Sequence, residues 1–324
     1  MSYDPKELTK GILEGNRRAL AKAITLVESS RVEDSKAADE ILYGIVSKPT
    51  SSIRIGISGV PGAGKSTFIE AFGMYVISQG KKVAVLAVDP TSPITGGSIL
   101  GDKTRMPELT QSMDAFIRPS PTSGNLGGVT RKTKDTILLC EAAGYEVIIV
   151  ETVGVGQSEV AVADMTDMFL LLLLAGAGDE LQGIKKGIME MADLILINKA
   201  DGANKINAEN ARHEFENALR LFKPKYKYWN SPVLTISSLL KNGIENVWEQ
   251  IQKFMQASGE QLIINRKMQY DKWLWSYLQN QIYYEIQNLK ENNPLILKIQ
   301  EDVKEKKISI RTAANTILEE YKKS

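Results

Sequence analysis

Cysteine and histidine are almost absent from this sequence of 324 residues, which contains one of each. The single cysteine, Cys140, cannot form an intramolecular disulfide, and its apolar neighbours predict a buried thiol. The single histidine, His213, lies in a charged stretch with helical periodicity, so we expect it to be solvated. Because zinc and nickel sites are built mainly from these two residue types, the composition argues against an intrinsic site for either metal.

The sequence also lacks net charge and long apolar runs. Its 40 basic and 39 acidic residues leave a net charge of +1, which gives no indication of a nucleic acid or another polyanion as partner. The longest apolar run, Met168–Ala175, is far too short to span a bilayer. The N-terminus opens with Asp4-Pro5-Lys6-Glu7 and has no apolar segment of a secretory signal. We therefore expect a cytoplasmic protein that does not bind membranes.

One stretch, Gly59–Ser66, matches the phosphate-binding pattern G-x-x-x-x-G-K-[ST], and a strand-like run, Ile53–Ile57, precedes it. Its glycines let the backbone curl so that N–H groups point at phosphate oxygens, and the following helix adds the positive end of its dipole. Lys65 is expected to reach the β- and γ-phosphates, and the Ser66 hydroxyl to bind Mg²⁺. The predicted phosphate-binding residues are Gly59, Val60, Pro61, Gly62, Ala63, Gly64, Lys65, Ser66 and Thr67.

Strand and helix patterns alternate between residues 51 and 258. This alternation predicts an α/β fold in which a mostly parallel central sheet carries helices on both faces. Residues 1–50 and 259–324 show helical periodicity only, so we expect helical N- and C-terminal extensions. The broad apolar stripe of the C-terminal part can pack on its own sheet or form a dimer contact. The predicted strands are Ile53–Ile57, Val83–Val88, Ala115–Arg118, Val147–Val150, Phe169–Leu174, Leu194–Ile197 and Val233–Ile236.

A guanine-recognition pattern, N-K-x-D, follows the strand that ends at Ile197. The Asp201 carboxylate can accept hydrogen bonds from both N1–H and the amine of guanine, whereas adenine would leave it unpaired, which discriminates by roughly 10⁴ or more. Asn198 is expected to help hold the base edge, and the Lys199 stem to lie over the ring. A backbone N–H for guanine O6 is expected after the last strand, from Ser237, Ser238 and Leu239.

Three acidic residues lie where a metal ion or a water molecule could be held. Asp89 ends the second strand, Asp102 lies in the following loop, and Glu151 ends the strand Val147–Val150. Phosphoryl transfer to water needs Mg²⁺, an in-line water and charge neutralisation. Gly154 is expected to donate its backbone N–H to the γ-phosphate, so the segment beyond it can act as a switch. Gln157 is a candidate for orienting the attacking water. Each acid could instead be a simple loop or capping carboxylate.

Several segments together resemble the MeaB/ArgK/MMAA family of GTPases, and the match is colinear over nearly the whole chain. Glutamate at 151, where related GTPases carry aspartate, is typical of this group. The resemblance implies a P-loop fold of the signal-recognition/MinD class, with an N-terminal helical segment (1–50), a GTPase domain (51–258) and a C-terminal arm (259–324) that forms a homodimer. The segments are Val88–Pro93, Gly96–Met106, Arg118–Pro121, Leu126–Gly128 and Glu151–Glu159.

The resemblance also implies a function. Such a GTPase hydrolyses GTP to GDP slowly until a partner stimulates it, and the partner is an adenosylcobalamin-dependent acyl-CoA mutase, most often methylmalonyl-CoA mutase. The GTPase would gate the loading of intact cofactor and help to remove damaged cofactor. The family's metal and catalytic carboxylates fall on Asp89, Asp102 and Glu151. Its movable third switch falls on Gly178–Gly187, where the residues of interest are Asp179, Gln182 and Lys185. The catalytic candidates are therefore Lys65, Asp102, Glu151, Gln157 and Lys185.

Two other functions stay open. A small-molecule kinase, a role long attached to the ArgK branch through transport of basic amino acids, would use the same phosphate loop. It would also need a second pocket that shields the acceptor from water, and no dedicated lid domain is visible. A nucleotide-gated scaffold would need no useful turnover. No residue is recognisable as a cobalt ligand, so direct binding of cobalamin is not predicted, and the acyl-CoA substrate of the mutase is not identified.

Overall fold

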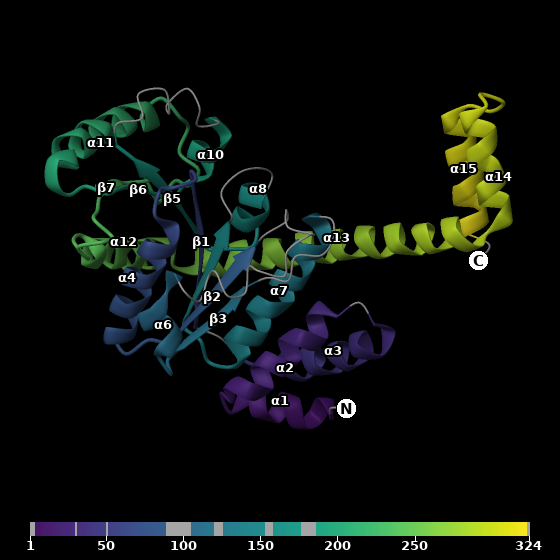
Figure 1. The fold of residues 1–324 in the computed structure, drawn as a ribbon, viewed down its shortest axis with the longest axis horizontal. Helices are drawn as coiled ribbons and strands as arrows, with labels where there is room; N and C mark the ends of the chain where they lie inside the picture. Colours follow the sequence, from purple (N-terminus) through teal and green to yellow (C-terminus); the bar gives the residue numbers. More distant parts are fainter. Residues whose placement is uncertain are drawn as a thin grey trace. The chain divides into compact units, whose positions relative to one another are not determined.

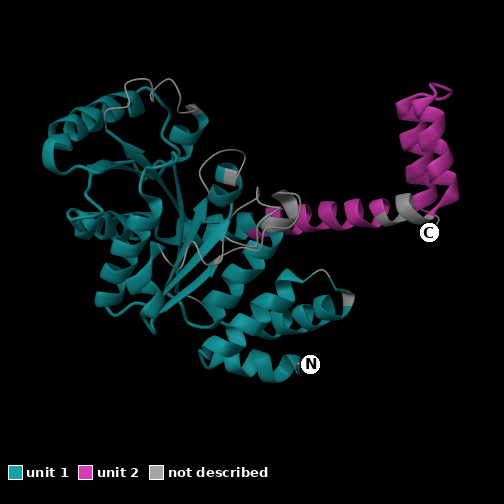
Figure 2. Ribbon diagram, viewed as in Figure 1, with its two compact units in different colours: residues 1–269 teal, residues 270–324 magenta. Residues whose placement is uncertain are grey.

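The computed structural model describes residues 4–29, 31–49, 51–88, 105–119, 126–152, 158–175 and 186–322. It divides into two compact units, residues 1–269 and 270–324 (Figure 2). The division falls inside helix α13 (Glu260–Asn292), 11 residues after the expected start of the C-terminal arm at residue 259. The N-terminal helices belong to the same unit as the sheet.

Seven strands form one sheet in the described part of the chain, in the order β3-β2-β4-β1-β5-β6-β7 (Figure 1). Every neighbouring pair is parallel, which confirms the predicted α/β class. Helices cover both faces, and strands such as β1 are therefore buried along their whole length. The strands are β1 (Ile53–Gly59), β2 (Val83–Val88), β3 (Ala115–Pro119), β4 (Val147–Thr152), β5 (Met168–Leu174), β6 (Leu194–Asn198) and β7 (Val233–Thr235).

The helices of this unit divide between the two faces of the sheet. Helix α4 packs against β1, β2, α6 and α12, whereas α7 and α8 contact each other and pack against β4. Phe68 and Phe72, one turn apart on α4, stack with ring centroids 5.4 Å apart and are fully buried. The i, i+4 spacing puts both rings on the face of α4 that meets the core. The helices are α4 (Lys65–Ser78), α6 (Pro107–Gln111), α7 (Leu126–Ala142), α8 (Ser158–Ala163), α10 (Lys186–Met191), α11 (Lys205–Leu219) and α12 (Ile244–Ser258).

Three N-terminal helices, α1 (Pro5–Leu13), α2 (Arg17–Glu28) and α3 (Val32–Ile45), lie together beside α7 (Figure 1). The chain breaks between α1 and α2 at Gly15-Asn16. Gly15 takes φ 77°, in the left-handed region that glycine adopts without strain. The Asn16 side chain then caps α2 by accepting from the backbone N–H groups of Arg18 and Ala19.

The second unit, residues 270–324, contains most of α13 and two shorter helices, α14 (Pro294–Lys304) and α15 (Ile310–Tyr321). The chain breaks between α14 and α15 at Lys306, which has φ 59°, and the Ser309 hydroxyl caps the start of α15 by accepting from the backbone N–H of Thr312. Among the described helices, none has both the length and the apolar character needed to cross a bilayer.

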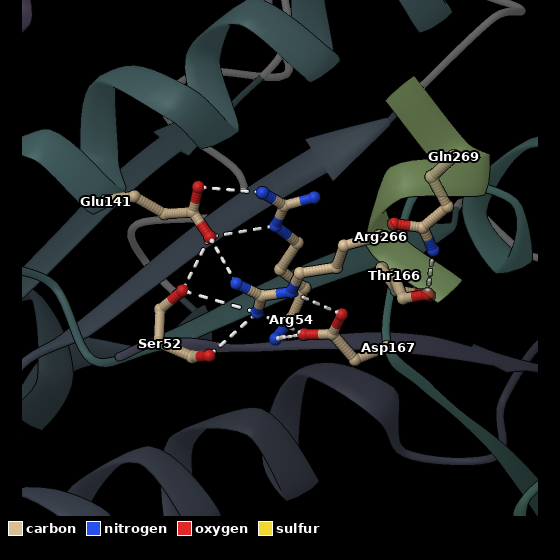
Figure 3. Close-up of polar contacts among 7 residues, drawn as sticks. All are labelled: Ser52, Arg54, Glu141, Thr166, Asp167, Arg266 and Gln269. Carbon is tan, nitrogen blue, oxygen red and sulfur yellow. Dashed lines mark hydrogen bonds and ion pairs between the residues drawn. The ribbon is translucent and has the colours of Figure 1, made fainter. Parts of the chain in front are cut away.

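A buried polar network lies where β1 begins (Figure 3). Arg54 is fully buried and donates from Nε and Nη2 to the two carboxylate oxygens of Glu141 on α7, each at 2.8 Å. The Ser52 hydroxyl donates to Glu141 Oε1 at 2.5 Å. Arg266, near the start of α13, donates from Nε to Asp167 Oδ1 at 2.8 Å. Asp167 also accepts from the backbone N–H of Arg54 at 2.8 Å. These contacts join β1, α7, the start of β5 and the first turns of α13.

The single cysteine and the single histidine have the environments that the sequence predicts, a buried one and a solvated one. Cys140 is buried inside α7, and burial raises the pKa of its thiol far above the ordinary value. Its role is therefore that of a small core side chain. The His213 side chain on α11 is 59% exposed, 3.6 Å from the carboxylates of Glu209 and Glu216. Both predictions are confirmed.

Candidate functional site

The loop between β1 and α4 has the backbone that phosphate binding requires. Gly62 and Gly64 adopt φ 81° and 86°, in the left-handed region. At two positions a larger residue would also collide with its surroundings. A Cβ at position 59 would lie 2.3 Å from the carbonyl oxygen of Leu172, and one at position 64 would lie 2.7 Å from Nδ2 of Asn198. Glycine is thus required at the two ends of the motif by contacts with β5 and with the end of β6.

This loop forms one wall of a cleft of about 580 Å³ at the carboxyl ends of the strands. That size is in the range of small-molecule sites, and the position is where open α/β sheets bind ligands. The cleft brings the phosphate loop together with the ends of β2 and β4 and the loop after β6. It is lined by Pro61, Gly62, Gly64, Lys65, Ser66, Thr67, Ala87, Arg105, Glu151 and Lys199.

Lys65 is held close to its own loop. Its Nζ donates to the carbonyl oxygen of Gly59 at 2.8 Å. Burial lowers the pKa of Lys65, while the carboxylates of Glu151 and Glu159 oppose this shift. Both carboxylates thus favour the ammonium form of this cleft-lining side chain.

Asn198 connects the phosphate loop to the loop after β7. Its side chain is buried, and its Nδ2 donates to the Ala63 carbonyl oxygen at 2.7 Å. Its Oδ1 accepts from the backbone N–H of Ser238 at 3.1 Å and from the Ser238 hydroxyl at 2.8 Å. Both polar ends of this side chain are thus engaged within the protein. Asn198 therefore links the phosphate loop to the loop after β7. Its predicted contact with the base edge stays a prediction.

Asp201 and its neighbours form the other end of the site. The Ser237 hydroxyl donates to Asp201 Oδ2 and accepts from the backbone N–H of Leu240 at 3.2 Å. Lys199 adopts φ 59°, a conformation that turns the chain sharply after β6. The Leu239 side chain is 76% exposed. The Asp201 carboxylate is half-buried, and the Ser237 hydroxyl already donates one hydrogen bond to it.

The residues predicted for the metal fall into two groups. Ser66 and Glu151 both line the cleft, and Glu151, at the end of β4, is only 8% exposed. The next residue, Thr152, donates from Oγ1 to Ser58 Oγ at 2.9 Å, which ties β4 to β1 at this edge. The remaining predicted positions lie outside the described residues: Asp89, Asp102, Gly154, Gln157, Lys185 and, in the third switch, Asp179 and Gln182.

Two residues at the site were given no role in the sequence analysis. Arg105 lines the cleft, and Glu159 on α8 is buried close enough to Lys65 to act on its charge. Both lie within segments that carry the family resemblance, yet neither belongs to a motif with an assigned function. Only their placement beside the phosphate loop distinguishes them from ordinary surface charges.

The donor set fits magnesium. Mg²⁺ prefers oxygen ligands and binds through one or two protein groups, with waters and substrate phosphates completing its shell. The hydroxyl of Ser66 and the carboxylate of Glu151 both face the cleft. One carboxylate oxygen of Glu159 is buried without a hydrogen-bond partner among the described residues. No set of three or more His, Cys, Asp or Glu side chains suited to a metal ion gathers in the described part of the chain.

The parallel sheet, the glycine-constrained loop and the cleft at the strand ends define a P-loop nucleotide-binding protein of the GTPase type. The family model described as "Methylmalonyl Co-A mutase-associated GTPase MeaB" matches residues 20–291. The chain therefore belongs to the MeaB family of methylmalonyl-CoA mutase-associated GTPases.

Individual relatives agree with this placement. The chain is 51% identical to the GTPase ArgK of Escherichia coli over 279 residues, which are 85% of this chain and 84% of that protein. It is 45% identical to the mitochondrial methylmalonic aciduria type A homolog of Mus musculus over 332 residues, 97% of this chain and 79% of the relative. A solved structure, a LAO/AO transport system kinase, is 39% identical with a TM-score of 0.77, covering 98% of this chain and 99% of the other.

Proposed function

We propose that this protein hydrolyses GTP to GDP and phosphate in a magnesium-dependent reaction. The observation that carries the proposal is the double contact of Asn198, which joins the phosphate loop to the loop beside Asp201. A nucleotide whose phosphates lie on the first loop would have its base at the second. A carboxylate at that position selects guanine, because only guanine offers it two adjacent donors.

Some residues of the cleft would bind the phosphates, and others would bind the metal or its water shell. The amides of Gly62 to Ser66 and the Lys65 ammonium would hold the phosphates, and Ser66 would bind the metal directly. Bound Mg²⁺ would neutralise charge that develops on the phosphate oxygens. Glu151 would act from the second layer around the metal, accepting hydrogen bonds from water. The further carboxylates proposed for the metal are Asp89 and Asp102. Gly154 would donate its backbone N–H to the γ-phosphate, Gln157 would orient the attacking water, and Lys185 is the catalytic candidate of the third switch.

We further propose that the GTPase serves as a chaperone of an adenosylcobalamin-dependent acyl-CoA mutase, methylmalonyl-CoA mutase being the expected partner. Membership of a family named for association with this mutase supports the proposal. Nucleotide state would gate the loading of intact cofactor and the removal of damaged cofactor. The test measures phosphate release from GTP and from ATP, with and without purified mutase. Acceleration of GTP turnover by the mutase is expected; a rate that does not change with mutase would contradict the chaperone role.

A homodimer formed through the C-terminal unit is also proposed. Large apolar side chains of α13 are exposed in this unit, including Leu274 at 63%, Trp275 at 57% and Leu278 at 43%. Exposed apolar clusters of this kind mark interaction sites. The test measures the mass of the protein in solution by light scattering. It compares the double variant Leu274→Glu/Leu278→Glu with Gln279→Glu as the matched control. The double variant should have the mass of one chain and the control that of two.

A small-molecule kinase is the second candidate, and the name of the 39%-identical LAO/AO transport system kinase favours it. The same phosphate loop would then deliver the γ-phosphate to an acceptor other than water. Incubation with radiolabelled GTP or ATP and basic amino acids distinguishes the two functions. A phosphorylated amino acid would support the kinase, whereas label recovered only as inorganic phosphate would support the GTPase.

A further inference from the structure

Glu159 is a buried carboxylate beside the phosphate loop that the roles above do not use. It lies in the first turn of α8, which packs against β1, β4 and β5. The residue is 3% exposed. Its charge acts on Lys65, as does that of Glu151. The charges of two carboxylates, one on β4 and one on α8, therefore act on the same ammonium group of the cleft.

One oxygen of this carboxylate is without a partner. Among the described residues, no hydrogen-bond donor reaches Oε2 of Glu159, although the atom is buried. A buried charged oxygen without a donor is costly, because it has lost its hydration and gained nothing in return. Glu159 does not itself line the cleft, but its charge acts on Lys65, which does. An unsatisfied oxygen this close to a ligand cleft indicates that a donor arrives when the ligand binds.

The chemistry of the nucleotide narrows the choice of donor. The oxygens of a nucleoside di- or triphosphate carry no hydrogens at neutral pH, so the phosphates cannot donate to Glu159. Lys65, which now donates to the Gly59 carbonyl oxygen, is required by the phosphates once they bind. The guanine N–H groups and the ribose hydroxyls also donate, but in the proposed arrangement they lie toward Asp201, away from the phosphate loop. At the phosphate end of the nucleotide, water is the remaining donor. Mg²⁺ keeps several waters when it binds phosphates, and the metal's charge makes these waters strong donors.

We propose that Glu159 is a positioning residue for magnesium, accepting a hydrogen bond through Oε2 from a water molecule in the metal's coordination shell. Ser66 on α4 and Glu151 on β4 would hold the metal and its water shell, and Glu159 on α8 would add a further hydrogen-bond acceptor for one of those waters. Hydrogen-bond partners of this outer layer orient the ligands of a metal, and their loss typically weakens metal binding 10- to 100-fold. This inference rests on the proposed magnesium-dependent GTPase.

The test is a titration of Mg²⁺ against GDP binding in the full-length protein. GDP affinity is measured by calorimetry in EDTA and at increasing Mg²⁺ for the wild type and for Glu159→Gln, which has nearly the same shape without the charge. In EDTA the two proteins should bind GDP within about twofold, since no metal-bound water is present. The Mg²⁺ concentration that gives half of the full change in GDP affinity should be at least ~10-fold higher for Glu159→Gln than for the wild type.

Two further variants make the result specific. Asp164→Asn removes an exposed carboxylate directly after α8 that faces Lys134, and it should keep the wild-type Mg²⁺ requirement. Glu159→Asp keeps the charge but shortens the side chain, so its Mg²⁺ requirement should lie between those of the wild type and Glu159→Gln. It also serves as the test variant if thermal melting shows that Glu159→Gln does not fold.

The outcomes separate the two proposals. If the GDP affinity of the wild-type protein does not change with Mg²⁺, the magnesium-dependent GTPase and this inference are both overturned. A wild type that responds to Mg²⁺, with Glu159 variants that respond identically, would overturn the role of Glu159 alone. Equal weakening of GDP binding by Glu159→Gln in EDTA and in Mg²⁺ would also overturn it, because it would place the effect on Lys65 and the phosphate loop.

Discussion

Replacement of Glu141 by glutamine tests the buried network at the start of β1, the strand that leads into the phosphate loop. The Arg54 and Glu141 side chains are 0% and 2% exposed, and Arg266 approaches Glu141 Oε1 to 3.6 Å. Burial by itself would raise the pKa of Glu141, but the hydrogen bonds and charge of Arg54, together with the charge of Arg266, hold it below its ordinary value. The carboxylate is therefore ionised at neutral pH.

The stability that Glu141→Gln should lose follows from the balance of charge in the network. Arg54 and Arg266 face Glu141 and Asp167, so the four charges cancel; glutamine at 141 leaves one uncompensated positive charge out of water. Its amide NH₂ would also face a guanidinium N–H of Arg54 in either orientation, because Arg54 donates to both oxygens of Glu141. Loss of one member of a buried ion pair costs about 3–5 kcal/mol. A loss of that size is a large part of the stability of an ordinary domain, which is of order 5–15 kcal/mol.

Urea unfolding at pH 7.5 measures the loss, with Glu146→Gln as the control. The Lys81–Glu146 pair is as short, at 2.6 Å, but its side chains are 43% and 34% exposed, so its loss should cost less than about 1 kcal/mol. Arg54→Met combined with Glu141→Leu should recover stability relative to Glu141→Gln, because it leaves no unpaired charge among the four. If Glu141→Gln costs no more than Glu146→Gln, the reasoning about this network is wrong.

Three further predictions concern the nucleotide site and pH. Lys65→Ala should abolish GTP hydrolysis and weaken nucleotide binding, measured by phosphate release and calorimetry; unchanged turnover would contradict the assignment of the phosphate loop. Asp201→Asn should shift preference from GTP toward xanthosine triphosphate, since the new amide can donate to the C2 oxygen, and retained GTP preference would place the base contact elsewhere. Burial raises the pKa of Asp135 to about 6, so the folded chain holds this proton more tightly than the unfolded chain and stability falls as pH rises from about 4 to about 6. Asp135→Asn should therefore stabilise the protein by about 1–3 kcal/mol at pH 7.5 and by little at pH 4, measured by urea unfolding at both values.

Local patterns were sufficient for the strands and the phosphate loop. An apolar run such as Leu194–Asn198 can only be buried on both faces, and the glycine pattern from Gly59 to Gly64 requires left-handed backbone wherever it occurs. The motif N-K-x-D identified Asn198 by type, but not its contacts. Its links to Ala63 and Ser238 depend on loops separated by 135 and 40 positions in the chain, and sequence spacing carries no information about such distances.

The sequence by itself determined the α/β class, the phosphate-loop motif and the family, because these depend on the periodicity and identity of neighbouring residues. Only the tertiary structure decided that Arg54, an ordinary residue in a strand, is fully buried against Glu141, and that Glu159 is enclosed next to Lys65 with one oxygen unpaired. The physical reason is that burial and electrostatic partners are properties of packing between distant segments. The same carboxylate that would be a solvated charge on an isolated helix becomes a candidate part of a metal site when a sheet and a phosphate loop surround it.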